Sequence, residues 1–284
     1  MVFDPGTDRY PYPDDTAEHY LIVKKNNGAV FDDAYPYVDS SPKMRVLQAL
    51  TRAALRAFVF PAARVRLGLR VRGRSNLKRF REELKNGAVT CSNHVHMWDF
   101  IAVLYALRPQ KPFVPVWPKN VRGENGALIR LVRGVPVPDT GAHATSVFNR
   151  SIGKELEKGG WLHVYAEGSM WEYYAPIRPF LSGTAYYACR YGLPLVPMAF
   201  SYRRPGWIRR KIFRQIALFT LSVGEPLFPD SRLSREERRE DLIDRSHRAV
   251  CALAGIDPDS NPYPAHYDRS RKTAYVSLKG LDSR

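Results

Sequence analysis

The chain has 284 residues, of which 44% are hydrophobic, and this composition excludes a disordered or low-complexity polymer. Lys and Arg outnumber Asp and Glu by 44 to 28, and the net charge of +16 requires an anionic partner such as nucleic acid, anionic lipid or a phosphorylated metabolite. The three cysteines are odd in number and widely spaced, which excludes a disulfide framework or a zinc knuckle and indicates a reducing cytoplasm.

Residues 1–42 are rich in Tyr, Pro and Asp and are expected to form an extension of the main domain. They contain no basic-then-apolar leader, and no apolar run in the chain approaches the ~18 residues that span a bilayer. We therefore expect a protein that is neither secreted nor membrane-spanning. Within the extension, apolar residues at 21–23 and 29–31 flank Asn-Asn-Gly at 26–28, a pattern typical of a β-hairpin.

A basic amphipathic helix is predicted over residues 43–63. Leu47, Leu50 and Phe58 recur at helical spacing, arginines gather on another face, and Pro61 is expected to end the helix. A helix of this kind is typical of a protein that lies on an anionic membrane surface. The alternative is that its apolar stripe packs on the main domain.

A second basic segment, residues 203–214, alternates cations with aromatic and aliphatic groups and includes Trp207. We interpret it as a further membrane contact, because a lipid substrate must be reached at the bilayer surface. The alternative is a solvated basic loop. The expected location is the cytoplasm, peripheral on the inner face of the membrane.

Residues 64–255 are predicted to form one α/β catalytic domain, followed by a tail over 256–284. Apolar residues alternate with Arg and Gly from 65 to 71, which predicts a strand, and short apolar runs then alternate with helical stretches. The runs are 88–91, 112–116, 161–165, 194–200 and 217–223, and the helical stretches are 100–107, 127–132, 145–156 and 183–191. This order predicts a single mixed sheet layered with helices. Residues 234–237, Ser-Arg-Glu-Glu, predict a capping box that opens a helix to about 254.

Two motifs carry the chemistry, and each directly follows a predicted strand. His94 leaves the run 88–91, and Asp99 opens the next helix, so a tight turn brings the carboxylate to one imidazole nitrogen and leaves the other to accept a proton. Glu167 leaves the run 161–165 in the sequence Ala-Glu-Gly-Ser-Met, where it orders a turn or accepts hydrogen bonds from a substrate. Taken alone, His94 and His96 are equally well explained as polar loop residues, with Asp99 as a helix N-cap.

Together the motifs resemble those of the glycerolipid acyltransferase family, Asn-His-x-x-x-x-Asp followed downstream by Pro-Glu-Gly-Thr-Arg. Residues 93–99 give the first motif in full, and 166–170 give the second in part. The similarity continues at 134–138 and 194–197 and extends over roughly residues 70–228.

The resemblance implies a fold like that of glycerol-phosphate acyltransferase and an enzyme that moves an acyl group without a cofactor. The donor would be a thioester of acyl carrier protein or coenzyme A, and the acceptor a hydroxyl of a lysophosphatidate-like glycerolipid. His94 would be the general base and Asp99 its partner, with backbone N–H groups near the histidine steadying the oxyanion. The resemblance also implies substrate-binding roles for Asn93, Glu167, Gly168 and Ser169.

The sequence departs from the family pattern at two positions. Met170 stands where the family carries an arginine, and Asp139 stands where an arginine closes its second block. Two expected phosphate ligands are therefore missing. A lipid acceptor without a phosphate group is the alternative to a lysophosphatidate-like acceptor. The cations that are candidates to replace them are Lys119, Arg122, Arg133 and Arg178.

Three other kinds of function fit the residues less well. His94, His96 and Asp99 do not have the spacing of a two-metal His-x-His-x-Asp-His site, so we expect no metal. No zinc finger, aromatic sheet motif or phosphate-binding loop supports nucleic acid as the anionic partner. Cys91, a small residue in a predicted strand, is expected to pack rather than to act as a nucleophile.

Overall fold

A computed structural model describes residues 3–5, 10–24 and 26–270. Its centre is a five-stranded sheet of order β1-β7-β6-β2-β5, in which β2 is parallel to both β5 and β6, while β7 runs antiparallel to β6 and parallel to β1. The strands are β1 (Arg70–Arg72), β2 (Ala88–Ser92), β5 (Trp161–Tyr165), β6 (Leu195–Arg203) and β7 (Leu218–Val223). A smaller parallel sheet pairs β3 (Val114–Val116) with β4 (Gly134–Pro136). The prediction of an α/β fold with a mixed sheet is confirmed.

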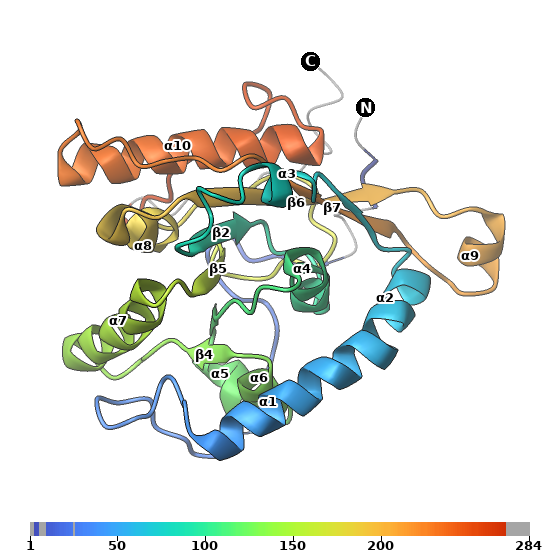
Figure 1. The fold of residues 1–284 in the computed structure, drawn as a ribbon. Helices are drawn as coiled ribbons and strands as arrows, with labels where there is room; N and C mark the ends of the chain where they lie inside the picture. The colour runs from blue at the N-terminus through green and yellow to red at the C-terminus, as the bar shows by residue number, and fades with distance from the viewer. Residues whose placement is uncertain (1–2, 6–9, 25, 271–284) are drawn as a thin grey trace.

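Helices cover both faces of the large sheet (Figure 1). One buried cluster joins the sheet to α7, α8 and α10, and a second joins its opposite face to α4. The helices after β1 are α3 (Asn76–Arg79), α4 (Asp99–Leu107), α5 (Pro118–Arg122), α6 (Gly126–Leu131), α7 (Ala142–Glu157), α8 (Gly183–Tyr191), α9 (Trp207–Lys211) and α10 (Arg235–Ala254). Among the described residues, no helix is both long enough and apolar enough to cross a bilayer.

The predicted basic helix is longer than its sequence pattern suggested. It comprises α1 (Pro42–Ala54), a π-helical turn (Leu55–Val59) and α2 (Phe60–Arg66), so the expected end at Pro61 is wrong. Proline lacks an N–H and crowds the carbonyl one turn earlier, and here it lies in the first turn after the π turn, where the altered hydrogen-bond pattern accommodates it. The strand expected from residue 65 is correspondingly short, because α2 occupies its first residues and β1 is only Arg70–Arg72.

The N-terminal extension packs on the catalytic domain. The hairpin predicted around 26–28 does not form, and the N–H of Asn27 instead donates to the carbonyl of Arg122 at 3.0 Å. Phe31 and Tyr37 are fully buried in the main core. The described part of residues 1–42 is therefore built into the domain.

The C-terminal helix begins and ends as the sequence predicted. Ser234 and Glu237 form the reciprocal capping box, and Gly255 ends α10 in the left-handed conformation that favours glycine. The chain then returns to the catalytic domain, where the N–H of Phe180 donates to the carbonyl of Ala265 at 2.8 Å. Residues 271–284 of the predicted tail lie outside the described residues.

Candidate active site

The two motifs leave the same edge of the sheet. Ser92 and Tyr165 are the last residues of the parallel strands β2 and β5 and lie in register, so the loops that follow them start side by side. Asn93, the first loop residue, is buried, and its side chain bonds to the backbone of Phe200 through both Nδ2 (3.1 Å) and Oδ1 (2.8 Å). Asn93 therefore joins the loop to β6. These two hydrogen bonds occupy the Asn93 amide, which was expected to bind substrate.

His94 and Asp99 form a dyad. Nδ1 of His94 lies 3.0 Å from Oδ2 of Asp99, and the imidazole stacks on the Tyr165 ring with centroids 3.8 Å apart. The same carboxylate oxygen accepts the N–H groups of Val95 (2.7 Å) and His96 (3.0 Å). Asp99 is thus held at the first residue of α4 by three donors that fix both the loop and the imidazole.

Burial sets the protonation of the dyad. The pKa of His94 is lowered by burial and by the nearby charge of Arg178, with Glu167 opposing the shift, so the imidazole is neutral at neutral pH. Burial raises the pKa of Asp99, while His96 and the N–H groups of Val95 and His96 oppose the rise. About a fifth of the His94 side chain, 22%, stays exposed to solvent. A neutral imidazole with an accessible edge is suited to accept a proton.

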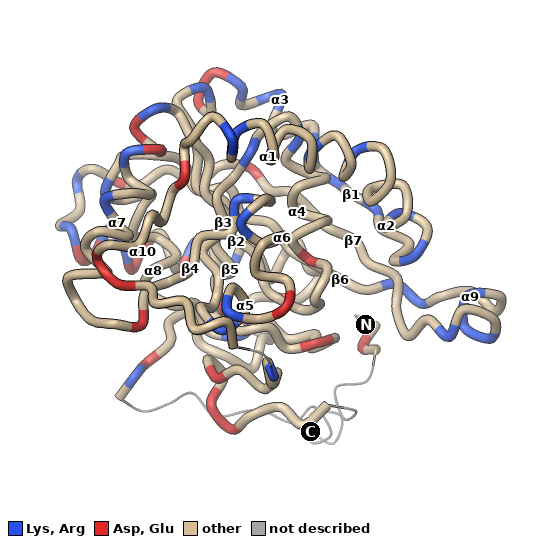
Figure 2. The backbone as a smooth tube through the Cα atoms, turned by 90° about the horizontal axis from the view of Figure 1, so that it is seen from below, with Lys and Arg blue, Asp and Glu red and all other residues tan. Residues whose placement is uncertain are grey.

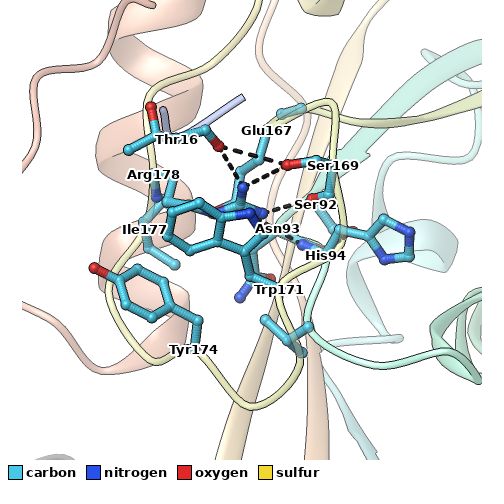
Figure 3. Close-up of polar contacts among 12 residues, drawn as sticks. Thr16, Ser92, Asn93, His94, Glu167, Ser169, Trp171, Tyr174, Ile177 and Arg178 are labelled. Carbon is cyan, nitrogen blue, oxygen red and sulfur yellow. Dashed lines mark hydrogen bonds and ion pairs between the residues drawn. The ribbon is translucent and has the colours of Figure 1, made fainter. Parts of the chain in front are cut away.

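Glu167 supports this loop from behind. Its Oε2 accepts the N–H of His94 at 2.9 Å and Nη2 of Arg178 at 2.8 Å, and its Oε1 accepts the N–H of Arg178 at 2.8 Å. Gly168 follows with a φ of 76°, in the left-handed region that favours glycine, and so turns the chain away from β5. Figure 3 shows the His94 imidazole directed away from the Glu167–Arg178 pair. In this arrangement Glu167 positions His94 and has no oxygen without a protein donor.

Arg178 is enclosed rather than open to substrate. Its side chain is 1% exposed and donates to Oγ of Ser169 (2.7 Å), to the Ser169 carbonyl (2.5 Å) and to the Thr16 carbonyl (2.6 Å) (Figure 3). The guanidinium also lies 4.4 Å over the Trp171 ring. These contacts correct the expectation that Arg178 and the Ser169 hydroxyl face an acceptor, because both are engaged within the protein.

The other candidate cations lie apart. Arg122 forms a two-pronged ion pair with Asp139 at 2.5 and 3.0 Å. Arg133 stacks on Phe113 at 3.6 Å and directly precedes β4, so it lies at the opposite edge of the sheets from His94, and burial lowers its pKa to about 10. The structure thus does not bring Arg133 to the site. Lys119 is exposed at the carboxyl end of β3, 5.0 Å from the Trp117 ring.

Met170 and Asp139, the two residues that replace arginines of the family pattern, are both held within the protein. Met170 is buried, with 6% of its surface exposed. Asp139 is neutralised by Arg122. Neither position provides a free cation for an acceptor phosphate.

The expected oxyanion donors are also occupied in part. The N–H groups of three successive residues, His94, Val95 and His96, all donate to the carboxylates of Glu167 and Asp99. These N–H groups organise the dyad and are not directed at a substrate oxygen.

Sequence reasoning missed His19, which the extension brings to this edge. Its ring stacks on Trp117 with centroids 4.0 Å apart. Burial lowers the pKa of His19 to about 4, and the charges of His94, Lys119 and Arg178 act in the same direction. Nothing in the local sequence signals this placement, because the segment has no periodicity and its contacts are far away along the chain.

Two alternatives can be compared with the geometry. Nε2 of His96 lies 3.5 Å from Oε1 of Glu172, and the described residues contain no group of three or more His, Cys, Asp or Glu side chains able to hold a metal ion. Burial raises the pKa of Cys91 to about 12, so its thiol is not ionised at neutral pH.

Comparison with known protein families gives one match, which includes both motifs. Residues 68–201, which contain both motifs, match the sequence model of the family described as Acyltransferase. This match supports the glycerolipid acyltransferase family that the motifs predicted, and with it an acyl-transferring enzyme.

Among solved structures, the chain is similar to PlsC, the 1-acyl-sn-glycerophosphate (LPA) acyltransferase from Thermotoga maritima. The two sequences are 17% identical, and the match has a TM-score of 0.44 and covers 76% of this chain and 84% of that one. Comparison with curated proteins gave no significant match.

Proposed function

We propose that this enzyme moves a fatty acyl group from a thioester to the hydroxyl of a lysophosphatidate-like glycerolipid, with His94 as general base. The observation that carries the proposal is the buried dyad, in which Asp99 holds Nδ1 of a neutral imidazole whose edge is open to solvent. The donor would be acyl carrier protein or coenzyme A carrying the acyl group, and no cofactor is needed for this chemistry.

In the proposed reaction, Nε2 of His94 takes the proton from the acceptor hydroxyl as its oxygen attacks the thioester carbonyl. A C–O bond forms, the C–S bond breaks, and the imidazolium returns the proton to the departing thiolate. The Asp99 carboxylate stabilises the imidazolium while the proton is in transit. The stack on Tyr165 restricts the ring to one orientation.

A second candidate acceptor is a lipid without a phosphate group. The observation that favours it is that Arg122 and Arg178 are both committed to protein carboxylates, while Met170 is apolar. Purified enzyme with labelled acyl donor and a panel of glycerol phosphate, lysophosphatidate, lysophospholipids, glycolipids and amino lipids separates the two candidates. A clear preference for lysophosphatidate would require a cation other than Arg122 and Arg178 to meet the phosphate.

The dyad is tested by matched substitutions. His94→Ala should lower turnover by at least ~10²–10⁴-fold, the usual share of a positioned general base. Asp99→Asn should also impair turnover, because an amide orients the imidazole in the wrong tautomer, and it removes the charge that stabilises the imidazolium. His96→Ala is the control and should be mild, since His96 contacts Glu172 and not the reacting nitrogen. A folded His94→Ala variant with full activity would disprove the mechanism.

We further propose that the enzyme works on an anionic membrane surface, peripheral on its cytoplasmic face. Leu50, Phe58 and Trp207 are 62%, 74% and 66% exposed, and Leu47 is also exposed. Figure 2 shows Lys and Arg along α1, α2 and α9, and Leu47, Leu50 and Trp207 belong to α1 and α9. Exposed apolar side chains set among cations suit the interface of an anionic bilayer.

A further inference from the structure

A cleft of about 510 Å³ opens between α2, the first residues of β1 and β7, and the end of β6. It lies on the catalytic edge of the sheet, because β6 is parallel to β2 and ends at Arg203, just as β2 ends beside His94. None of the described residues that line it is acidic. Its lining includes Arg64, Arg70, Arg203 and Arg209, with Val65, Leu69 and Leu218 between them. We name it the arginine cleft.

Arg203 is oriented without being neutralised. Its guanidinium donates to Oγ1 of Thr220 at 2.9 Å and to the carbonyls of Phe219 (3.1 Å) and Gly68. Neutral acceptors fix the geometry of the guanidinium but leave its charge uncompensated. Burial lowers the pKa of Arg203, and Arg70 is the first of the neighbouring arginines that lower it further. The crowding of like charges would be relieved by a bound anion.

The other three arginines follow the same pattern. Arg209 donates to the Val65 carbonyl at 2.8 Å and to Oε1 of Gln215 at 3.1 Å, both of which are neutral. Arg64 and Arg70 are exposed and form no ion pair within the described part of the chain. Four guanidinium groups therefore face one cleft, and no carboxylate of the described residues lines it.

Exposed apolar side chains surround the cleft. The bond from Arg209 to Val65 joins α9 to the end of α2, and Figure 1 shows these two helices side by side at one end of the molecule. The apolar residues that they and the loop after α9 expose are Val65, Trp207, Ile208, Ile212 and Phe213, each more than half exposed. A phosphate anion flanked by acyl chains matches this combination of cations and apolar groups better than an acidic protein surface does.

We propose that the arginine cleft binds the phosphate of an anionic phospholipid headgroup. This proposal rests on the proposed action at a membrane surface and assigns a site to it. Binding there seats α2 and α9 on the bilayer and turns the catalytic edge of the sheet toward the lipid. The headgroup in the cleft is a docking lipid, distinct from the acceptor that meets His94.

The test is co-sedimentation of the full chain with vesicles of phosphatidylcholine containing phosphatidylglycerol. Arg64→Gln with Arg70→Gln should weaken partition by about thirtyfold, about fivefold for each charge lost near the surface. Both side chains are exposed and have no ion-pair partner among the described residues, so the melting temperature should not change. Neutral phosphatidylcholine vesicles should not distinguish the variant from the wild type.

The matched control removes two arginines from the opposite edge of the sheet. Arg81 precedes β2, Arg235 opens α10, and both are exposed without an ion pair among the described residues. Arg81→Gln with Arg235→Gln should change partition by less than about twofold, because charges far from the surface are screened. Equal losses in the two double variants, or none in either, would overturn the proposal. So would intact vesicle binding combined with poorer use of an acyl carrier protein thioester, since the cleft would then be a protein dock.

Turnover on a short-chain acceptor dissolved as monomers separates this proposal from the proposed function. The cleft variant should match the wild type there, because no membrane is involved. A wild-type enzyme that transfers no acyl group to any acceptor would contradict the proposed function, and the vesicle comparison would still decide the cleft.

Discussion

Replacing Glu167 with glutamine tests whether this residue supports the site or binds substrate. The carboxylate receives three donors, the N–H of His94, the N–H of Arg178 and Nη2 of Arg178. A glutamine side chain can accept at its oxygen, but its NH₂ group must then face another donor. The substitution also leaves the Arg178 guanidinium buried without its counter-ion.

The expected cost follows from burial. Both partners of the ion pair are 1% exposed, and removing one member of a buried pair typically costs ~3–5 kcal/mol, because an uncompensated charge remains. A domain stability of roughly 5–15 kcal/mol makes this a large fraction of the total. The control is Glu225→Gln, which breaks the exposed pair with Arg79 and should cost no more than ~1 kcal/mol.

Urea unfolding followed by circular dichroism measures both variants. Activity should be assayed under conditions in which Glu167→Gln is still folded, where turnover should fall because the His94 loop is no longer fixed. If Glu167→Gln is as stable as the wild type and only raises the KM for the acceptor, Glu167 is a substrate ligand and the supporting role is wrong.

Two further predictions concern pH and the membrane. Burial lowers the pKa of His163 to about 3 and of His247 to about 4. Each histidine therefore stays neutral in the folded protein at pH 5, but takes up a proton in the unfolded chain once the pH is below the ordinary value of ~6.5. The free energy of unfolding should fall as the pH drops from 7 to 5, by ~2 kcal/mol for each histidine. Urea unfolding at pH 7 and pH 5 checks this, and equal free energies would contradict it. Leu50→Glu with Trp207→Ala should reduce co-sedimentation with anionic vesicles and leave the unfolding free energy nearly unchanged, because both side chains are largely exposed. Unchanged sedimentation would exclude α1 and α9 as membrane contacts.

The sequence was most informative where the determinants are local. The strand that ends before His94 and the helix that begins at Asp99 follow from short apolar runs and one tight turn, so both could be predicted. The continuation of the helix past Pro61 could not be predicted, because it depends on a π-helical turn that no residue type in the sequence indicates.

The roles of single cations were not predictable for a different reason. Arg178 and Arg122 look like equally free surface charges in the sequence, yet one is buried against Glu167 and the other is paired with Asp139. Their partners are set by how distant segments pack, and the spacing of residues along the chain does not indicate this packing. The same reason explains why His19 was missed.

The loop behind His94 is held by segments that lie far before and far after it in the sequence, and this has a consequence for the order of folding during synthesis. The carbonyls of Thr16 and Glu18 accept bonds from Arg178 and Trp171, although these residues follow them by more than 150 positions. The N-terminal segment leaves the ribosome first, but its partners do not exist until most of the domain has been made. Tyr263, 2.5 Å from the Tyr174 hydroxyl, arrives later still. The support of the site is therefore completed only after Tyr263 has emerged, and a nascent chain arrested before that residue would lack it.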